Sequence, residues 1–425
     1  MISERVMDVA RLRDLEQQHF AQVLSRSSDV FVERGQGSYL YTPEGRRYLD
    51  FAMGIATVNT GHSHPRVIAA AKAQIDKLVH PSATAVHYAP NVELVARLAE
   101  ITPGELNVTF LSNSGAEAVE SSLKLARYVT GRPTIVAFMG GFHGRTMGAL
   151  SVTSSKVHYR ERYEPLMPST YFAPFPHPFR CPLGHAPAHC CQQCLAFLER
   201  QFERVIDPHS VAAILVEPVQ GEGGYIPAPP SFLAGLREIC DRFGILLIFD
   251  EVQTGFGRTG KWWASQHYGV TPDIQVMAKA IASGFPLSAV SSTRAIMDAW
   301  LPGAHGSTYG GNPVSCAAAC ATIDVIREEG MIENAARMGG LLQDRLRTLQ
   351  AIYPVIGEVR GLGLMVAAEF THLDGSPNGA AAGALQRHCL EHNLILLTCG
   401  PADQTIRFIP PLNVSEAELD EGLAI

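Results

Sequence analysis

The chain lacks long apolar runs and has no excess of positive charge. None of its stretches approaches the roughly 18 consecutive apolar residues that a transmembrane helix requires. Its formal net charge is −7, with 34 basic against 41 acidic side chains, which argues against nucleic-acid partners because they select a basic surface. Residues 1–17 mix charges throughout and lack the apolar segment of a secretory signal. We therefore expect a cytoplasmic protein with neither membrane nor nucleic-acid partners.

Hydrophobic residues and cysteines, by contrast, are well represented. A hydrophobic content of 46% over 425 residues is enough to bury a large core without disulfides or metals. At roughly 100–200 residues per domain, this length allows two to four domains. In a reducing compartment the nine cysteines are expected to be free thiols or ligands and not disulfides.

Five short apolar runs in the middle of the chain predict buried strands. Stretches of helical period separate them, and this alternation implies a largely parallel α/β sheet covered on both faces. In such sheets, ligand-binding groups lie just beyond the carboxyl ends of the strands. Candidate functional residues are therefore sought there. The runs are Val108–Leu111, Ile135–Phe138, Ala212–Val216, Ile245–Phe249 and Ile274–Met277.

The two ends of the chain have a different sequence pattern. Leu12 to Leu24 suit one face of a helix that packs on another part, and residues 38–51 read as a hairpin turning at Pro43–Gly45. Residues 318–425 predict a second, smaller α+β region that the N-terminal segment joins. We expect an N-terminal segment over 1–60, a large domain over 61–317 and a small domain over 318–425. The C-terminal elements expected are helices over Ala317–Glu329 and Glu333–Leu349, strands near Gly361–Glu369, Leu394–Leu397 and Ile406–Phe408, and a short last helix capped by Ser415 with Glu418.

Charged residues follow the last two predicted strands of the middle region. Asp250 ends one strand, where a buried acid needs a partner; a protonated pyridine nitrogen is such a partner and would keep the ring able to accept electrons. Lys279 follows the next strand, and a buried lysine with a lowered pKa forms imines readily. Taken alone, Asp250 is better explained as a cap and Lys279 as a lysine reaching solvent. Their positions on successive strands make a functional role for Lys279 much harder to dismiss.

Two glycine-containing turns follow two other predicted strands. Asn113–Ala118 opens a helix whose N-terminal N–H groups suit a phosphate, although many helices begin in this way. Gly140–Arg145 carries Phe142, which could stack on a flat ring, and Arg145, which could pair with a carboxylate. A core phenylalanine and a surface arginine are the alternatives.

Together these residues resemble the class III (subgroup II, fold type I) pyridoxal-phosphate-dependent aminotransferases. The segment Phe249–Gly260, with Asp273 and Lys279 downstream, looks like that family's signature, and the likeness runs from about residue 30 to the C-terminus. It implies a large domain with a mostly parallel seven-stranded sheet, a smaller α+β domain, and a homodimer whose active site lies between the subunits. Assembly beyond a dimer, such as a tetramer, stays open.

The resemblance also implies a role for each matching residue. Lys279 would hold the cofactor as a Schiff base and later carry a proton, and Asp250 would pair with the pyridine nitrogen. Gln253 would bond the phenolic oxygen, Phe142 and Val252 would sandwich the ring, and Thr308 would reach the phosphate in the other subunit. The remaining residues implied to bind the cofactor are Ser114, Gly115 and Ala116 at the phosphate, with His143 and Glu217 in the same pocket.

Within the family, the chain most resembles 4-aminobutyrate aminotransferases, through Ile55 in Phe51–Pro65, Glu222 in Glu217–Gly224 and Arg407 in Cys399–Pro411. Arg145 would bind the carboxylate distant from the reacting amine, and Arg407 the α-carboxylate of glutamate or 2-oxoglutarate. An ω-amino acid has no α-carboxylate and would leave Arg407 uncompensated, which is costly. Glu222 would then pair with Arg407, unless that pair is only structural. The expected reaction passes an amino group from an ω-amino acid to 2-oxoglutarate by a ping-pong mechanism, giving a semialdehyde and glutamate.

Other substrates and classes stay open. Phe142 stands where 4-aminobutyrate aminotransferases more often have tyrosine, so acetylornithine, ornithine or another ω-amine is an alternative donor, and pyruvate an alternative acceptor. A racemase or epimerase of the same fold is a second alternative, and a non-catalytic binding module a third.

An insertion over about 176–196 departs from the family pattern. It contains Cys181, Cys190, Cys191 and Cys194 with His177, His185 and His189, the residue types of a zinc site. The adjacent Cys190 and Cys191, and the lack of a second clean Cys-x-x-Cys pair, weaken that interpretation. We expect a packed, thiol-bearing loop without metal.

Overall fold

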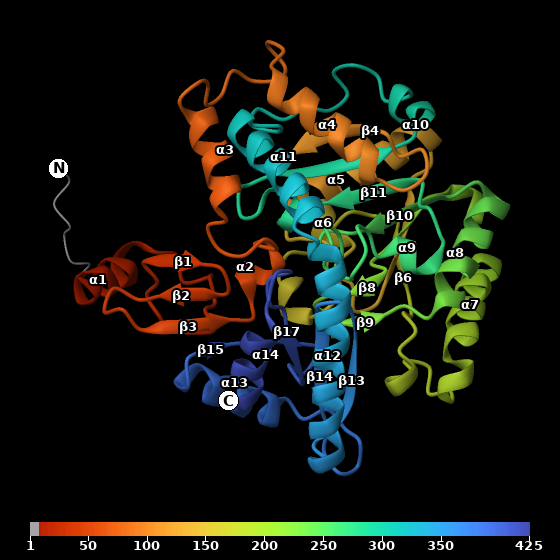
Figure 1. Ribbon diagram of the computed structural model, residues 1–425. Helices are drawn as coiled ribbons and strands as arrows, with labels where there is room; N and C mark the ends of the chain where they lie inside the picture. Colours follow the sequence, from red (N-terminus) through yellow and green to blue (C-terminus); the bar gives the residue numbers. More distant parts are fainter. Residues whose placement is uncertain (1–7) are drawn as a thin grey trace.

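A seven-stranded sheet forms the centre of the computed structural model, which describes residues 8–425 (Figure 1). The strand order is β4-β12-β11-β10-β7-β5-β6; β12 is antiparallel to both its neighbours and all other neighbouring pairs are parallel. The predicted α/β class is therefore confirmed. The strands are β4 (Val108–Ser112), β5 (Thr134–Phe138), β6 (Thr170–Ala173), β7 (Val211–Val216), β10 (Leu246–Asp250), β11 (Ile274–Met277) and β12 (Ser288–Ser292).

All five strands predicted from apolar runs are present, whereas β6 and β12 were not predicted by position. β12 has the sequence Ser-Ala-Val-Ser-Ser and so contains no apolar run. Its serine hydroxyls are satisfied across the sheet instead: Ser288 bonds Ser112 and Ser291 bonds Thr109, both at 2.7 Å between oxygens. A buried polar strand of this kind depends on its neighbour, which sequence periodicity does not reveal.

Helices cover both faces of the sheet, which explains why the strands are apolar throughout. Along β5, Val136 and Phe138 pack towards α7 (Pro187–Arg204) and α8 (Pro230–Phe243), whereas Ile135 and Ala137 pack towards α5 (Gly115–Thr130). A further group of helices, α3 (Pro65–Ile75), α4 (Ala89–Ile101) and α11 (Pro313–Glu328), packs near β4 and β12, and the long α12 (Met331–Ile352) extends from it towards the C-terminal sheet (Figure 1).

The C-terminal region forms its own antiparallel sheet, in the order β13-β14-β17-β16. The predicted strands near Gly361–Glu369 are a hairpin that turns at Gly363, whose φ is 52°. The predicted capping box is present, since Ser415 and Glu418 each bond the other's backbone N–H. The elements are β13 (Ile356–Leu362), β14 (Met365–Phe370), α13 (Gly379–Glu391), β16 (Leu397–Cys399), β17 (Thr405–Phe408) and α14 (Glu416–Ala424).

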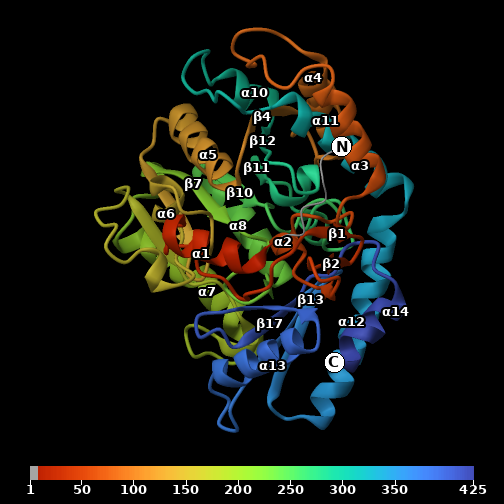
Figure 2. The same ribbon diagram turned by 90° about the vertical axis from the view of Figure 1, so that its left-hand side faces the viewer.

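The N-terminal segment shares a sheet with a strand of this C-terminal region. The hairpin of β2 (Tyr39–Tyr41) and β3 (Arg47–Asp50) is extended by β1 (Arg34–Gln36) and by β15 (Leu394–Ile395), which runs parallel to β3 (Figure 1). Figure 2 shows β1 and β2 of this sheet above α13 and α14. Helix α1 (Val9–His19) has no buried residue, although it contacts the segment that follows it: Arg13 donates to the Asp29 carbonyl at 2.8 Å and lies over the Phe31 ring. The domain limits at 60 and 317 remain predictions. The short elements are α2 (Met53–Ala56), α6 (Met147–Ser151), β8 (Val219–Gln220), β9 (Ile226–Pro227), α9 (Ser265–Tyr268) and α10 (Arg294–Asp298).

None of the helices within residues 8–425 is both long enough and apolar enough to span a bilayer.

Adjacent glycines of α12 allow a test of how the large and small sheets are joined. A Cβ on Gly339 would collide with the backbone of Gly363, whereas one on Gly340 would meet open space. We expect Gly339→Ala to lower the melting temperature by several degrees, because overpacking typically costs about 1–3 kcal/mol. Gly340→Ala should leave it unchanged or raise it, since alanine favours helix by roughly 0.5–1 kcal/mol. Equal melting temperatures for the two variants would contradict this packing.

Candidate active site

A cavity of about 530 Å³ opens at the carboxyl ends of the parallel strands. Segments that follow β4, β5, β7, β10 and β11 all contribute to its wall, as expected where strands of one direction end at a common edge. Every predicted site residue except Thr308 lines this cavity: Ile55, Ser114, Gly115, Ala116, Phe142, His143, Arg145, Glu217, Glu222, Asp250, Val252, Gln253, Lys279 and Arg407.

Asp250, at the end of β10, is buried and fully engaged. Its Oδ2 lies 2.7 Å from Nδ1 of His143, and its Oδ1 accepts a hydrogen bond from the Val252 N–H at 3.0 Å. Burial opposes the charged imidazolium, but the hydrogen bond and charge of Asp250, with the charge of Glu217, outweigh it and raise the pKa of His143. These contacts fix the position of the Asp250 carboxylate at the cavity wall.

Lys279 follows β11, the neighbour of β10, and has a left-handed backbone with φ of 45°. A non-glycine residue in this conformation is strained and depends on its surroundings. Burial lowers the pKa of the Lys279 amine to about 8, and the positive charge of Arg407 acts in the same direction against Asp250, Glu217 and Glu222. About a tenth of this amine is therefore neutral, and nucleophilic, at pH 7, compared with well under a thousandth of an ordinary lysine.

The N-terminus of α5 opens into the same cavity. Ser114 caps the helix by accepting a hydrogen bond from the Glu117 N–H, which leaves Gly115 and Ala116 in its first turn at the cavity wall. A Cβ on Gly115 would come within 3.2 Å of the Val252 side chain, so glycine gives a ligand close access to the backbone. Free N–H groups and the positive end of the helix dipole suit a phosphate here.

Phe142, Val252 and Gln253 form another part of the wall. The Phe142 ring meets the Tyr159 ring edge to face, with centroids 5.4 Å apart. The Gln253 side-chain oxygen is buried and has no hydrogen-bond partner within residues 8–425, which is costly unless a ligand supplies one.

Glu217 follows β7 and organises two turns of the cavity. Its carboxylate accepts hydrogen bonds from the N–H groups of Phe142 at 2.9 Å and Gly221 at 2.8 Å. Burial raises the pKa of Glu217 to about 7, with the charge of Asp250 adding to this and His143 opposing it.

The two arginines of the cavity differ in their partners. Arg145 lines the cavity and is exposed. Within the described chain, no carboxylate oxygen lies within 4.0 Å of its guanidinium. The guanidinium lies over the rings of Phe142 and Tyr159, 5.4 and 4.8 Å from their centroids. Arg407, on β17, is buried and lies 3.1 Å from Glu222, and it also donates to the Thr398 carbonyl at 2.7 Å. Arg145 thus has no carboxylate partner within the described chain, whereas Arg407 is paired with Glu222.

Of the predicted residues Ile55 and Thr308, the first lines the cavity and the second does not. Ile55 lies at the cavity wall, with a left-handed backbone at φ of 61°. Thr308 is exposed and lies outside this cavity.

Sequence reasoning missed two side chains that contact Glu222, of which only Tyr159 lines the cavity. Tyr159 lines the cavity and donates to Glu222 at 3.3 Å, and Lys156 lies 3.6 Å from the same carboxylate. Both come from the irregular segment after α6, where no periodic pattern points to a ligand. Only the folded chain brings this segment beside the β8–β9 turn.

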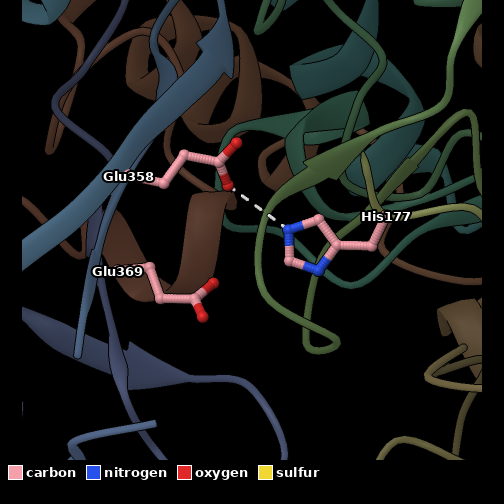
Figure 3. Close-up of side chains that lie close together, drawn as sticks. All are labelled: His177, Glu358 and Glu369. Atoms are coloured by element: carbon pink, nitrogen blue, oxygen red, sulfur yellow. Dashed lines mark hydrogen bonds and ion pairs between the residues drawn. The ribbon is translucent and has the colours of Figure 1, made fainter. Parts of the chain in front are cut away.

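The cysteine-rich insertion is not the loop that was expected throughout its length, because Cys190, Cys191 and Cys194 lie on α7. Its four cysteines are free thiols, with Cys190 and Cys194 buried beneath α8. Within residues 8–425, the one set of three metal-type ligand atoms within 4.8 Å of one another is His177, Glu358 and Glu369, which contains no cysteine (Figure 3). Both glutamates pair with arginines: Arg360 lies 2.5 Å from Glu358 and 2.7 Å from Glu369, and Arg180 2.7 Å from Glu369. This cluster is an ion-pair network joining the insertion to β13 and β14.

Comparison with known proteins agrees with this geometry. The family model described as aminotransferase class-III matches residues 21–425. The chain belongs to the class-III aminotransferases. Its cofactor is accordingly pyridoxal phosphate, and its substrates are a small amino donor and a 2-oxo acid acceptor.

Several relatives cover nearly the whole chain. The 5-aminovalerate aminotransferase DavT of Pseudomonas putida is 44% identical, covering 93% of this chain and 92% of the relative. An acetylornithine aminotransferase of Archaeoglobus fulgidus is 42% identical (96% and 98%), and the 4-aminobutyrate aminotransferase GabT of Escherichia coli 41% (93% and 92%). The crystal structure of a PLP-bound amine transaminase from an uncultivated Pseudomonas species is 32% identical, with a TM-score of 0.88 over 96% of this chain and 97% of that one. The predicted family and the type I fold are thus confirmed.

The residues of the cavity fit this cofactor. The N-terminus of α5 with Gly115 suits its phosphate, the unpartnered Gln253 oxygen marks a polar contact that a ligand must complete, and Lys279 presents a reactive amine.

The lowered pKa of Lys279 predicts how the chain takes up its cofactor. Only the neutral amine attacks the cofactor aldehyde, so the rate of covalent attachment to the cofactor-free chain should rise with pH through a midpoint near 8, and not near lysine's ordinary 10.5. Removing a positive charge in Arg407→Met should move the midpoint upwards. Stopped-flow absorbance measures the rate, and borohydride reduction with mass spectrometry verifies attachment, with Lys279→Ala as the control that attaches none. A midpoint that Arg407→Met leaves unchanged would contradict the electrostatic account.

Proposed function

We propose that this aminotransferase moves the amino group of an ω-amino acid, of the size of 4-aminobutyrate or 5-aminovalerate, to 2-oxoglutarate, giving a semialdehyde and glutamate. The observation that carries the proposal is the pair of arginines in one cavity, of which Arg145 has no carboxylate partner and Arg407 is held by Glu222. The names of the Pseudomonas and Escherichia relatives support the same class of donor.

The two arginines explain how one cavity accepts two kinds of substrate. An ω-amino acid offers a single carboxylate, which would bind Arg145 while the Arg407–Glu222 pair stays closed. Glutamate and 2-oxoglutarate offer a second carboxylate, which would bind Arg407 in place of Glu222. Because a buried guanidinium needs a counter-charge at every stage, the ion pair at 3.1 Å keeps Arg407 neutralised during the first half-reaction. Ile55 would lie against the apolar part of the substrate.

Bound pyridoxal phosphate supplies an electron sink and carries the amino group between the two half-reactions. Around it, Asp250 would keep the pyridine nitrogen protonated, with His143 and the Val252 N–H fixing its carboxylate. Gln253 would bond the phenolic oxygen, and Phe142 and Val252 would enclose the ring. Ser114, Gly115 and Ala116 would hold the phosphate, and Glu217 would order the turns at Phe142 and Gly221. Lys279 Nζ would bind the cofactor covalently and then move a proton at the substrate carbon that bears the amino group.

The proposal includes a homodimer. Thr308 is exposed outside its own cavity, which suits a residue that completes the site of a second copy. Helix α1 has no buried residue, and with the exposed Phe20, Val23 and Leu24 that follow it it offers apolar surface to such a partner. A cytoplasmic location is supported by the nine cysteines, all of which are free.

Half-reaction spectra test the donor and the acceptor separately. We expect 4-aminobutyrate and 5-aminovalerate to shift the cofactor absorbance of the purified enzyme, and 2-oxoglutarate to restore it. Arg145→Met should weaken both half-reactions, because both substrates lose the partner of their distal carboxylate. Arg407→Met should weaken the 2-oxoglutarate half-reaction by at least about tenfold and spare the other, since a lost buried charge pair costs about 2–5 kcal/mol.

Other outcomes would select the alternatives. A stronger response to acetylornithine or ornithine would favour those donors, with which the Archaeoglobus relative's name agrees. A 2-oxo acid other than 2-oxoglutarate that restores the spectrum better, such as pyruvate, would change the acceptor. If no donor shifted the spectrum while an amino acid lost its optical purity, the enzyme would be a racemase or epimerase.

A further inference from the structure

The carboxylate of Glu222 has a basic side chain near each of its two oxygens. Its Oε2 lies 3.1 Å from Nη1 of Arg407, and its Oε1 lies 3.6 Å from Nζ of Lys156. Oε1 also accepts a hydrogen bond from the Tyr159 hydroxyl at 3.3 Å. Arg407 and Lys156 are the only basic side chains within 4.0 Å of this carboxylate in residues 8–425. Glu222 therefore lies between a paired guanidinium and a second cation that it does not yet contact closely.

Lys156 is placed behind Glu222 and not in front of it. Tyr159, Glu222 and Arg407 form part of the cavity wall, whereas Lys156 does not. The Lys156 side chain is only 10% exposed and is anchored at the cavity periphery by Asp403, 2.6 Å away. Burial disfavours its charge, but the hydrogen bond to Asp403 and the charge of Glu222 outweigh this and raise the pKa of Lys156. Lys156 is thus a cation that lies near Glu222 and outside the cavity wall.

A substrate α-carboxylate at Arg407 creates an electrostatic problem for Glu222. The displaced carboxylate would remain close to the incoming one, and its side chain is only 17% exposed, so water cannot solvate it freely. Two carboxylates at this separation repel each other strongly in a poorly solvated site. The displaced group therefore needs a cation at its new position as much as Arg407 needed an anion.

We propose that Lys156 is a positioning residue that receives the carboxylate of Glu222 when the α-carboxylate of a dicarboxylic substrate takes over Arg407. The distance of 3.6 Å has to shorten by only about 0.8 Å to reach that of a charge-assisted hydrogen bond, about 2.8 Å. Tyr159 already donates to the oxygen that would move. The inference rests on the proposed function, since it concerns the half-reaction with 2-oxoglutarate.

Asp403 provides a natural competitor for Lys156. It is 56% exposed and accepts hydrogen bonds from Lys156 and, at 3.3 Å, from the Thr398 hydroxyl. Asp403 therefore shares the lysine's charge with Glu222. Weakening Asp403 should strengthen the pull of Lys156 on Glu222, which is the opposite of what weakening Lys156 should do.

Single-turnover half-reactions with four variants test this role. Lys156→Gln removes the cation, Lys156→Arg keeps it, and Asp403→Asn removes its competitor. Lys72→Gln, on the exposed part of α3, controls for the loss of a lysine elsewhere. Each protein is measured with an ω-amino acid in the cofactor's aldehyde form and with 2-oxoglutarate in its amine form. Calorimetry then compares binding of glutarate, an unreactive dicarboxylate, with that of valerate, a monocarboxylate of the same length.

We expect Lys156→Gln to raise the apparent dissociation constant of 2-oxoglutarate at least tenfold while changing that of the ω-amino acid less than twofold. Glutarate binding should weaken to a similar extent and valerate binding should not. Lys156→Arg should restore most of the loss, Asp403→Asn should tighten glutarate binding, and Lys72→Gln should match the parent. An unchanged ω-amino acid half-reaction also shows that the variant is folded.

Three results would overturn the inference. Equal weakening of both half-reactions would mean that Lys156 binds the carboxylate common to both substrates or only maintains the fold. Unchanged 2-oxoglutarate and glutarate binding would mean that Glu222 needs no receiving cation. Loss in Lys156→Arg equal to that in Lys156→Gln would mean that charge is not what matters. If the parent itself failed to use 2-oxoglutarate, the proposed function would fail in that control, whereas glutarate binding would still decide the role of Lys156.

Discussion

A buried guanidinium cannot be left without a counter-charge, and in this protein that constraint falls on Arg407. Its side chain is 7% exposed, and Glu222 at 3.1 Å provides the balancing charge. The two residues come from different parts of the chain, since Arg407 is on β17 of the C-terminal sheet and Glu222 is on the turn between β8 and β9. The ion pair therefore links the two regions at the cavity wall as well as neutralising the arginine.

The positive charge of Arg407 also acts on Lys279. Arg407 contributes to the low pKa of Lys279, second only to burial, while Asp250, Glu217 and Glu222 oppose it. The state of the Arg407–Glu222 pair and the reactivity of the lysine are thus coupled through space. The Asp250 carboxylate does not change partners with the substrate, because His143 and the Val252 N–H bond its two oxygens. Fixed hydrogen bonds hold the charge at the cofactor end, whereas an exchangeable ion pair sets it at the substrate end.

Sequence reasoning found the parts of the site that follow predicted strands. Asp250, Lys279 and the turn at Ser114–Ala116 each come directly after an apolar run, and parallel strands bring such positions to one edge. β12 escaped prediction because its serines are satisfied by hydroxyls of β4, a pairing that no local pattern contains. Lys156 and Tyr159 escaped for a related reason, because their segment is irregular and meets Glu222 only through the tertiary fold. The N-terminal helix was found, but none of the residues of α1 is fully buried in the part of the chain that the structure describes.

The surroundings of Glu222 indicate which part of it can move. Its carbonyl accepts the Gly400 N–H at 2.9 Å, and two residues further on the Gly224 carbonyl accepts from Arg360 at 2.6 Å. Arg360 is itself fixed by Glu358 and Glu369, the carboxylates that His177 and Arg180 also contact (Figure 3). The backbone of the turn is therefore tied to the C-terminal sheet, and displacing it would break several buried polar contacts at once. Rotation of the Glu222 side chain changes only the contacts of its carboxylate with Arg407, Tyr159 and Lys156. A substrate carboxylate can thus exchange with Glu222 while the cavity wall stays in place.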